Sequence, residues 1–202
     1  MGRFFHWFSC RAFPIVFVFT TVTTGELMNK IAALVSIALF AWGGAAHAKG
    51  SARTKVVESI EINAAPDAVW NLIKDFGDAK WIPAVEGATV NNVGDKLVRV
   101  LTLKKGGEIK EELKEADAAT KTLKYRSHDD PDCKVFPTKS YSAAISVTPV
   151  GASSKVEWMS AAYHCSISNN PPPGEDQKAA LEAMTTLSKD ALANLKVLAE
   201  KP

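Results

Sequence analysis

The sequence has almost no surplus of charge and no run of basic residues. Its 202 residues include 24 Lys and Arg against 22 Asp and Glu. The first 48 residues hold three basic residues and one acidic residue, which leaves 21 of each sign from Lys49 to Pro202. Affinity for nucleic acid depends on a basic surface that neutralises phosphates. We therefore exclude a nucleic-acid-binding protein.

Motifs that hold metals, cofactors or nucleophiles are also missing. Two histidines follow residue 48, His128 and His164, and neither belongs to an H-x-x-x-H, H-E-x-x-H or Cys/His cluster. The sequence contains no G-x-S-x-G elbow, no P-loop and no G-x-G-x-x-G motif. We predict no metal, no cofactor and no catalytic residue. The missing motifs argue against enzymatic activity but do not exclude it.

Residues 28–48 have the three parts of a secretory signal peptide. A short polar start with Lys30 precedes the twelve residues Ile31–Trp42, which only Ser36 interrupts, and an A-x-A cleavage site ends at Ala48. The apolar core is too short to span a bilayer comfortably. We predict cleavage after Ala48 and export to the periplasm, where the protein is not attached to a membrane. The folded domain is expected at residues 49–202.

Residues 1–27 contain a second apolar run, Phe13–Phe19, without a comparable cleavage site. Our preferred interpretation is that translation starts at Met28. The alternative is a long leader or an uncleaved membrane anchor. Under either interpretation, residues 1–48 lie outside the folded domain.

Export changes the interpretation of the cysteines. Cys10 lies in the leader, which leaves Cys133 and Cys165 as an even pair in an oxidising compartment. We predict a disulfide that closes a 33-residue loop and stabilises the fold by roughly 3 to 4 kcal/mol. Two free thiols or a redox pair are the alternatives, although the sequence has no C-x-x-C spacing.

Apolar residues with a period of two predict an antiparallel sheet. The expected strands are Val56–Ile62, Leu97–Leu103, Ile109–Glu115, Leu123–His128, Tyr141–Thr148 and Val156–Ala162. A three-residue turn, Lys105-Gly106-Gly107, would place Leu103 opposite Ile109 and Arg99 opposite Leu113. Arg99 and Glu111 would then be diagonal neighbours on a face that is otherwise apolar.

Two helices are expected at either end of this run of strands. The first opens at Pro66, ends near Gly77 and is followed by a short helix or turn over residues 79–85. The second begins at Glu175 and runs to about Glu200. Its predicted apolar stripe consists of Leu181, Met184, Leu187, Ala191, Leu195 and Leu198.

The stretch Val57–Trp81, which reads VESIEINAAPDAVWNLIKDFGDAKW, resembles the opening of the START-like, polyketide cyclase superfamily called SRPBCC. The later segments VRVLTLKKGGEIKEEL, LKYRSHDDP and YSAAISVTPVGASSKVEW follow in that family's order, so the resemblance covers essentially residues 55–200. It implies an α+β helix-grip fold, in which a curved antiparallel sheet of about six to seven strands wraps around a long C-terminal helix.

The leader, the loop PPPGEDQKAA and the closing ALANLKVLAEK resemble one branch of that family, the MxaD-like periplasmic accessory proteins of methanol oxidation. This resemblance implies a non-catalytic helper of a quinoprotein methanol (alcohol) dehydrogenase and its c-type cytochrome partner. Two alternatives stay open. One is a carrier of a small apolar or lipid-like ligand, and the other is a polyketide cyclase/dehydratase-like enzyme, of which the superfamily contains examples.

Six residues are candidates to line a ligand cavity between sheet and helix: Trp81, Arg99, Glu111, Tyr125, Tyr141 and Trp158. Inward charges are costly unless paired, so Arg99 and Glu111 must meet each other, water or a ligand. They could orient a ligand or serve as acid and base, or they could form a structural ion pair or a wetted end of the sheet. The aromatic residues could line the cavity or simply fill the core.

Overall fold

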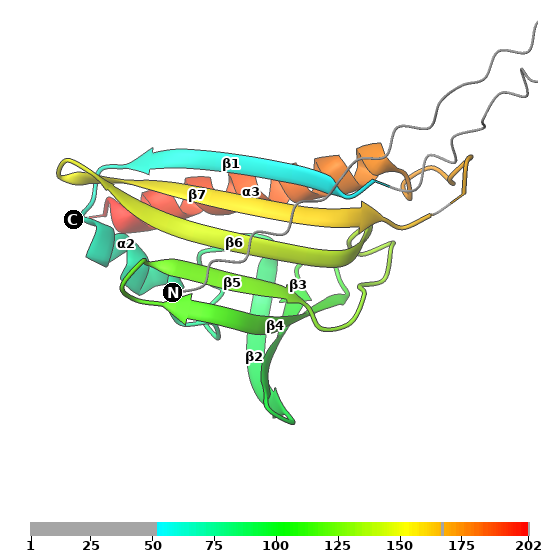
Figure 1. Ribbon diagram of the computed structural model, residues 1–202, viewed down its shortest axis with the longest axis horizontal. Coiled ribbons are helices and arrows are strands. Elements are labelled where there is room, and N and C mark those ends of the chain that lie inside the picture. Colours follow the sequence, from blue (N-terminus) through cyan, green and yellow to red (C-terminus); the bar gives the residue numbers. More distant parts are fainter. Residues whose placement is uncertain (1–51, 167, 202) are drawn as a thin grey trace, which may run out of the picture. The chain divides into compact units, whose positions relative to one another are not determined.

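The computed structural model describes residues 52–166 and 168–201, shown in Figure 1. The predicted translation start at Met28 and cleavage site after Ala48 lie outside these residues. In the part that the structure describes, neither helix is long and apolar enough to cross a membrane.

Seven antiparallel strands form one curved sheet in the order β1-β7-β6-β5-β4-β3-β2 (Figure 1). Their bounds are β1 Thr54–Ile62, β2 Val85–Val93, β3 Lys96–Leu103, β4 Glu108–Asp117, β5 Thr122–Ser127, β6 Thr138–Val150 and β7 Ser153–His164. The long helix α3 (Gln177–Ala199) packs on β1 and β7 and also contacts the short helix α2 (Pro66–Ile73). The predicted α+β helix-grip fold is therefore confirmed.

Helix α2 begins as predicted but ends earlier. Pro66 occupies its first turn, where a missing N–H costs nothing, and the side chains of Val69, Trp70 and Ile73 are buried. The chain leaves the helix after Ile73 rather than near Gly77. Residues 79–84 form turns, which is one of the two predicted alternatives, and β2 begins at Val85. These turns carry Trp81 into the core.

Helix α3 begins after Asp176, whose carboxylate accepts a hydrogen bond from the Ala179 N–H at 2.7 Å. Its buried face differs in part from the predicted stripe. Met184, Ala191 and Leu195 are buried as expected, but Leu181 is 42% exposed. The buried face also includes Ala180, Ser188 and Leu192. Small side chains let the helix approach the sheet closely, and hydrophobicity alone does not identify them.

The register of the β3–β4 hairpin corrects the predicted one. The Leu103 N–H donates to the Gly107 carbonyl at 3.0 Å, so the loop is Lys104–Gly106. Both Gly106 and Gly107 adopt positive φ, and a Cβ on Gly107 would collide with Val135. With the loop one residue earlier, Arg99 lies directly opposite Glu111 and not on its diagonal.

Strand β2 is an edge strand that the sequence pattern does not predict. None of its nine residues is buried, because α3 packs on β1 and β7, at the other end of the sheet. Without a buried face, a strand leaves no alternation of apolar and polar residues.

The predicted disulfide between Cys133 and Cys165 is present, with the two Cα atoms 6.0 Å apart. It joins the loop after β5 to the end of β7. The pairing of Thr138 with His164 brings these segments together.

Replacing Cys133 and Cys165 by serine together should lower the free energy of unfolding by roughly 3 kcal/mol, because the unfolded chain regains the entropy of an open loop. Urea unfolding measures the change. Dithiothreitol should lower the stability of the wild type to that of the double variant and leave the double variant unchanged. Equal stability of the two oxidised proteins would contradict the prediction.

Candidate functional site

The six predicted site residues all lie in the core. Trp81, Arg99, Glu111, Tyr125, Tyr141 and Trp158 are each exposed by 4% or less. Arg99 comes from β3, Glu111 from β4 and Tyr125 from β5, so neighbouring strands place their side chains on one face. Because a buried charge is costly unless it is paired, the contacts of Arg99 and Glu111 determine whether the core can hold these two charges.

Arg99 is held by a set of polar and aromatic contacts. Its Nε donates to Glu111 Oε2 at 2.6 Å, and its Nη1 donates to the Phe76 carbonyl oxygen at 3.1 Å. The guanidinium carbon lies 4.3 Å from the ring centroid of Phe76 and 4.8 Å from that of Tyr125. Its Nη2 is buried and has no hydrogen-bond partner in the described residues.

Burial and the ion pair shift the pKa values of this cluster. Burial raises the pKa of the Glu111 carboxyl, and the Arg99 guanidinium opposes that rise. Burial lowers the pKa of Arg99, but the Glu111 carboxylate together with the Tyr125 and Tyr141 side chains outweighs it, and the net shift is upward. Burial also raises the pKa of Tyr125 and of Tyr141. Both phenols therefore keep their protons at neutral pH and are hydrogen-bond donors.

Aromatic rings fill nearly all the space around the ion pair. The ring of Tyr141 lies 5.5 Å from that of Phe136 and 6.4 Å from that of Tyr125, and the rings of Trp81 and Trp158 are 5.3 Å apart. The remaining cavity measures about 10 Å³, which is the space of about one water molecule. Five of the six predicted residues line it, and Trp81 instead packs against Trp158.

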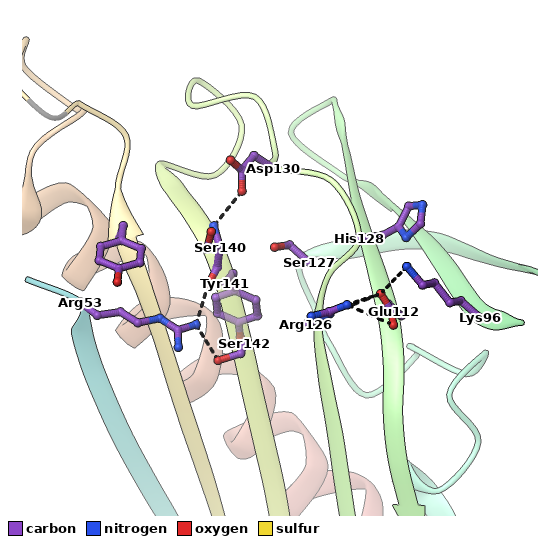
Figure 2. Close-up of a pocket in the computed structure, with 11 residues that line it drawn as sticks. Arg53, Lys96, Glu112, Arg126, Ser127, His128, Asp130, Ser140, Tyr141 and Ser142 are labelled. Atoms are coloured by element: carbon purple, nitrogen blue, oxygen red, sulfur yellow. Dashed lines mark hydrogen bonds and ion pairs between the residues drawn. The ribbon is translucent and has the colours of Figure 1, made fainter. Parts of the chain in front are cut away.

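A larger hollow, which we call the outer groove, lies on the outer face of the sheet. It has a volume of about 650 Å³ and is bounded by Arg53, Lys96, Glu112, Arg126, Ser140 and Ser142. It opens where the pairing of β5 with β6 ends, at Arg126 and Ser142. Figure 2 shows Arg53 and Ser142 on one side, Arg126 and Glu112 on the other, and Tyr141 between them.

Glu112 gathers three cations beside the outer groove. Its carboxylate is only 4% exposed, because Lys96, Lys114 and Arg126 cover it with N to O distances of 3.7, 2.9 and 3.1 Å. The hydrogen bond from Lys114, with further contributions from Arg126, lowers the pKa of Glu112 to about 2. Glu112 is therefore ionised at any physiological pH.

A bulge in β6 shapes the opposite wall of the groove. The register of β6 with β7 shifts between Lys139 and Ser142, and Ser140 has a φ of 49°. The left-handed conformation costs a residue with a Cβ about 1 to 2 kcal/mol. Two side chains hold it, since Asp130 accepts from the Ser140 N–H at 2.7 Å and Arg53 donates to the Ser140 carbonyl at 2.6 Å.

Apart from Tyr141, the residues that line the outer groove were not among the predicted site residues. Arg53 precedes the first strand, and Lys96, Glu112 and Arg126 come from three different strands. Only the strand register brings them together. Residues 52–166 and 168–201 contain no group of three or more His, Cys, Asp or Glu side chains that could hold a metal ion.

Comparison with known families gives one match. The family model described as polyketide cyclase / dehydrase and lipid transport matches residues 53–200. No curated protein sequence matches the chain.

Several solved structures share the fold. An uncharacterised protein from Bacillus thuringiensis is 22% identical with a TM-score of 0.61, covering 73% of this chain and 100% of its own. The protein XoxI from Bacillus cereus is 24% identical with a TM-score of 0.60, covering 72% and 94%. The Zhui aromatase/cyclase from Streptomyces sp. R1128 is 16% identical with a TM-score of 0.59, covering 74% and 94%. Such identities establish a common fold alone.

The Arg99–Glu111 pair predicts non-additive effects on stability. Arg99→Met or Glu111→Leu alone should lower the free energy of unfolding by about 3 to 5 kcal/mol, because each leaves an uncompensated buried charge. The double variant should recover most of this loss. Urea unfolding of the three variants measures the coupling. As a control, Lys124→Ala, which breaks an exposed pair with Glu115, should cost at most about 1 kcal/mol. The prediction would be refuted if the Arg99/Glu111 double variant lost as much stability as the two single variants together.

Because the pKa of Glu112 is lowered in the folded protein, we expect the free energy of unfolding to depend on pH. Its folded-state pKa of about 2 lies below the ordinary 4.5, so its contribution is complete above pH 4.5 and is lost as the pH falls towards 2. Unfolding curves measured across this range should show a steeper loss of stability for the wild type than for Glu112→Gln. Glu108→Gln, on the same strand and without an ion pair in the described part, should follow the wild type. Parallel curves for wild type and Glu112→Gln would count against the assignment.

Proposed function

The chain belongs to the polyketide cyclase / dehydrase and lipid transport family, and we propose that it acts there as a non-catalytic binding protein that contacts a partner protein through its surface. The observation that carries this proposal is the filled interior. Small-molecule sites usually measure about 300 to 1,000 Å³, whereas the cavity beside Arg99 and Glu111 measures about 10 Å³. An enzyme or a carrier needs interior room, and a docking protein does not.

The outer face of the sheet offers a surface for docking. Val57 and Ala144 both lie opposite Met159 across β1, β7 and β6, and with Ala161 and Tyr163 they form what we call the outer patch. Val57 is 48% exposed, Met159 38% and Tyr163 40%. Helix α3 covers the other face of β1 and β7 (Figure 1). Small side chains between exposed apolar ones make a flat surface suited to another protein.

We propose a periplasmic location and a quinoprotein methanol (alcohol) dehydrogenase or its c-type cytochrome as the partner. Support for the location comes from the signal peptide in residues 28–48. Support for the partner comes from the closing segments PPPGEDQKAA and ALANLKVLAEK, which resemble the MxaD-like accessory proteins.

Titration into an assay of methanol dehydrogenase with its c-type cytochrome tests this function. We expect the purified protein to increase the rate of electron transfer to the cytochrome in a saturable way. Met159→Asp should raise the half-saturating concentration about tenfold, because a charge would be buried in an apolar contact. Val197→Asp is the matched control, since Val197 is 56% exposed on α3. An unchanged rate, or equal effects of the two variants, would oppose the proposal.

A second candidate function rests on the Nη2 atom of Arg99, which is buried without a partner. A ligand oxygen in the adjacent cavity would supply an acceptor for it, as in a carrier of a small ligand or a cyclase/dehydratase-like enzyme that uses Arg99, Glu111 and a tyrosine. Native mass spectrometry distinguishes the two functions: a co-purifying small molecule that Glu111→Gln releases supports the carrier or enzyme, and a ligand-free protein supports the docking protein.

A further inference from the structure

The outer groove carries uncompensated positive charge on both of its sides. On one side, the three cations Lys96, Lys114 and Arg126 surround the single carboxylate of Glu112. On the other side, Arg53 forms no ion pair with a carboxylate of the described residues. The carboxylates of Glu112 and of Asp130 at the rim offset two of the four positive charges, which leaves an excess of two. A groove lined in this way attracts anions.

Each arginine is held by hydrogen bonds from part of its guanidinium group only. Arg126 donates to Glu112 from Nε and Nη2, and Arg53 donates from Nη2 to the Ser140 carbonyl, the Ser142 hydroxyl and the Ala161 carbonyl at 2.6, 2.8 and 3.0 Å. Within the described residues, Nη1 of each arginine forms no hydrogen bond. Donors that are already held in place lose little entropy when they bind a ligand.

The acidic residue at the rim is directed to the backbone and not to the arginines. Asp130 accepts from the Ser140 N–H and so keeps Ser140 in its left-handed conformation. Figure 2 shows Ser127 and Ser142 between Arg53 and Arg126. Strained residues and bulges of this kind re-aim side chains at functional sites. Here the bulge ends at Ser142, whose hydroxyl accepts a hydrogen bond from Arg53.

From this arrangement we propose that the outer groove binds a small molecule that carries an oxyanion, either a carboxylate or a phosphate group. Its oxygens accept hydrogen bonds from Arg126 and Arg53, and the serine hydroxyls complete the contacts. The volume of about 650 Å³ lies within the range of small-molecule sites. The proposal concerns the protein alone and does not depend on a partner protein.

Nuclear magnetic resonance titrations of the ¹⁵N-labelled protein test this site. Sodium phosphate and sodium succinate are added separately, with the ionic strength held constant by sodium chloride. We expect saturable shifts of the backbone amides of residues 126–128 and 140–142 with at least one anion. Shifts with phosphate alone identify a phosphate site, and shifts with succinate alone identify a carboxylate site. Absence of saturable shifts with both overturns the proposal.

Charge-removing variants separate a built site from general attraction of anions. Arg126→Gln and Arg53→Gln should each weaken binding about tenfold, because each removes one charged hydrogen-bond donor. Lys124→Gln is the matched control, since Lys124 lies on the same strand in a pair with Glu115 at 2.9 Å, outside the groove. Its affinity should stay within about twofold of the wild type. Equal weakening by all three variants would overturn the proposal. Because the two arginines lie on opposite walls of the groove, one variant still tests the site if the other fails to fold.

Discussion

The buried ion pair between Arg99 and Glu111 constrains much of the fold around it. Each buried charge costs several kcal/mol to remove from water, so the surrounding structure has to supply compensating contacts. The register of β3 with β4 places the two residues directly opposite each other. The segment after α2 turns the Phe76 carbonyl towards Arg99, and the rings of Phe76 and Tyr125 cover the guanidinium. Hairpin register, turn and aromatic packing thus follow from one requirement.

The sequence pattern correctly predicted that Arg99 and Glu111 share one face of the sheet, but it predicted the wrong register between their strands. Side chains alternate along a strand whatever its partner is, so Arg99 and Glu111 could be assigned to the inner face from the pattern alone. Their pairing depends on the loop, where Gly106 and Gly107 both have positive φ. Two adjacent glycines allow more than one turn, and in the turn adopted Gly107 lies too close to Val135, which is distant in the sequence, to carry a Cβ.

The outer groove was beyond the reach of sequence patterns for a related reason. Its walls depend on a bulge at Ser140, which shifts the register of β6 without any glycine or proline to mark it. Its charges come from strands that meet only when the sheet forms. The disulfide was predictable because it required only a count of cysteines and a compartment. Features that depend on long-range pairing need the structure.

Glu111 and Glu112 are neighbours on β4, yet the two faces of the sheet give their carboxyl groups opposite properties. Inside, burial raises the pKa of Glu111, and aromatic rings close the space around it. Outside, surrounding cations lower the pKa of Glu112, and the groove beside it stays open. The inner carboxylate therefore lies in a packed core, where the remaining cavity has the space of about one water molecule. The outer charge organises cations that a second molecule can reach, so the chemistry available for recognition lies on the outer face of the sheet.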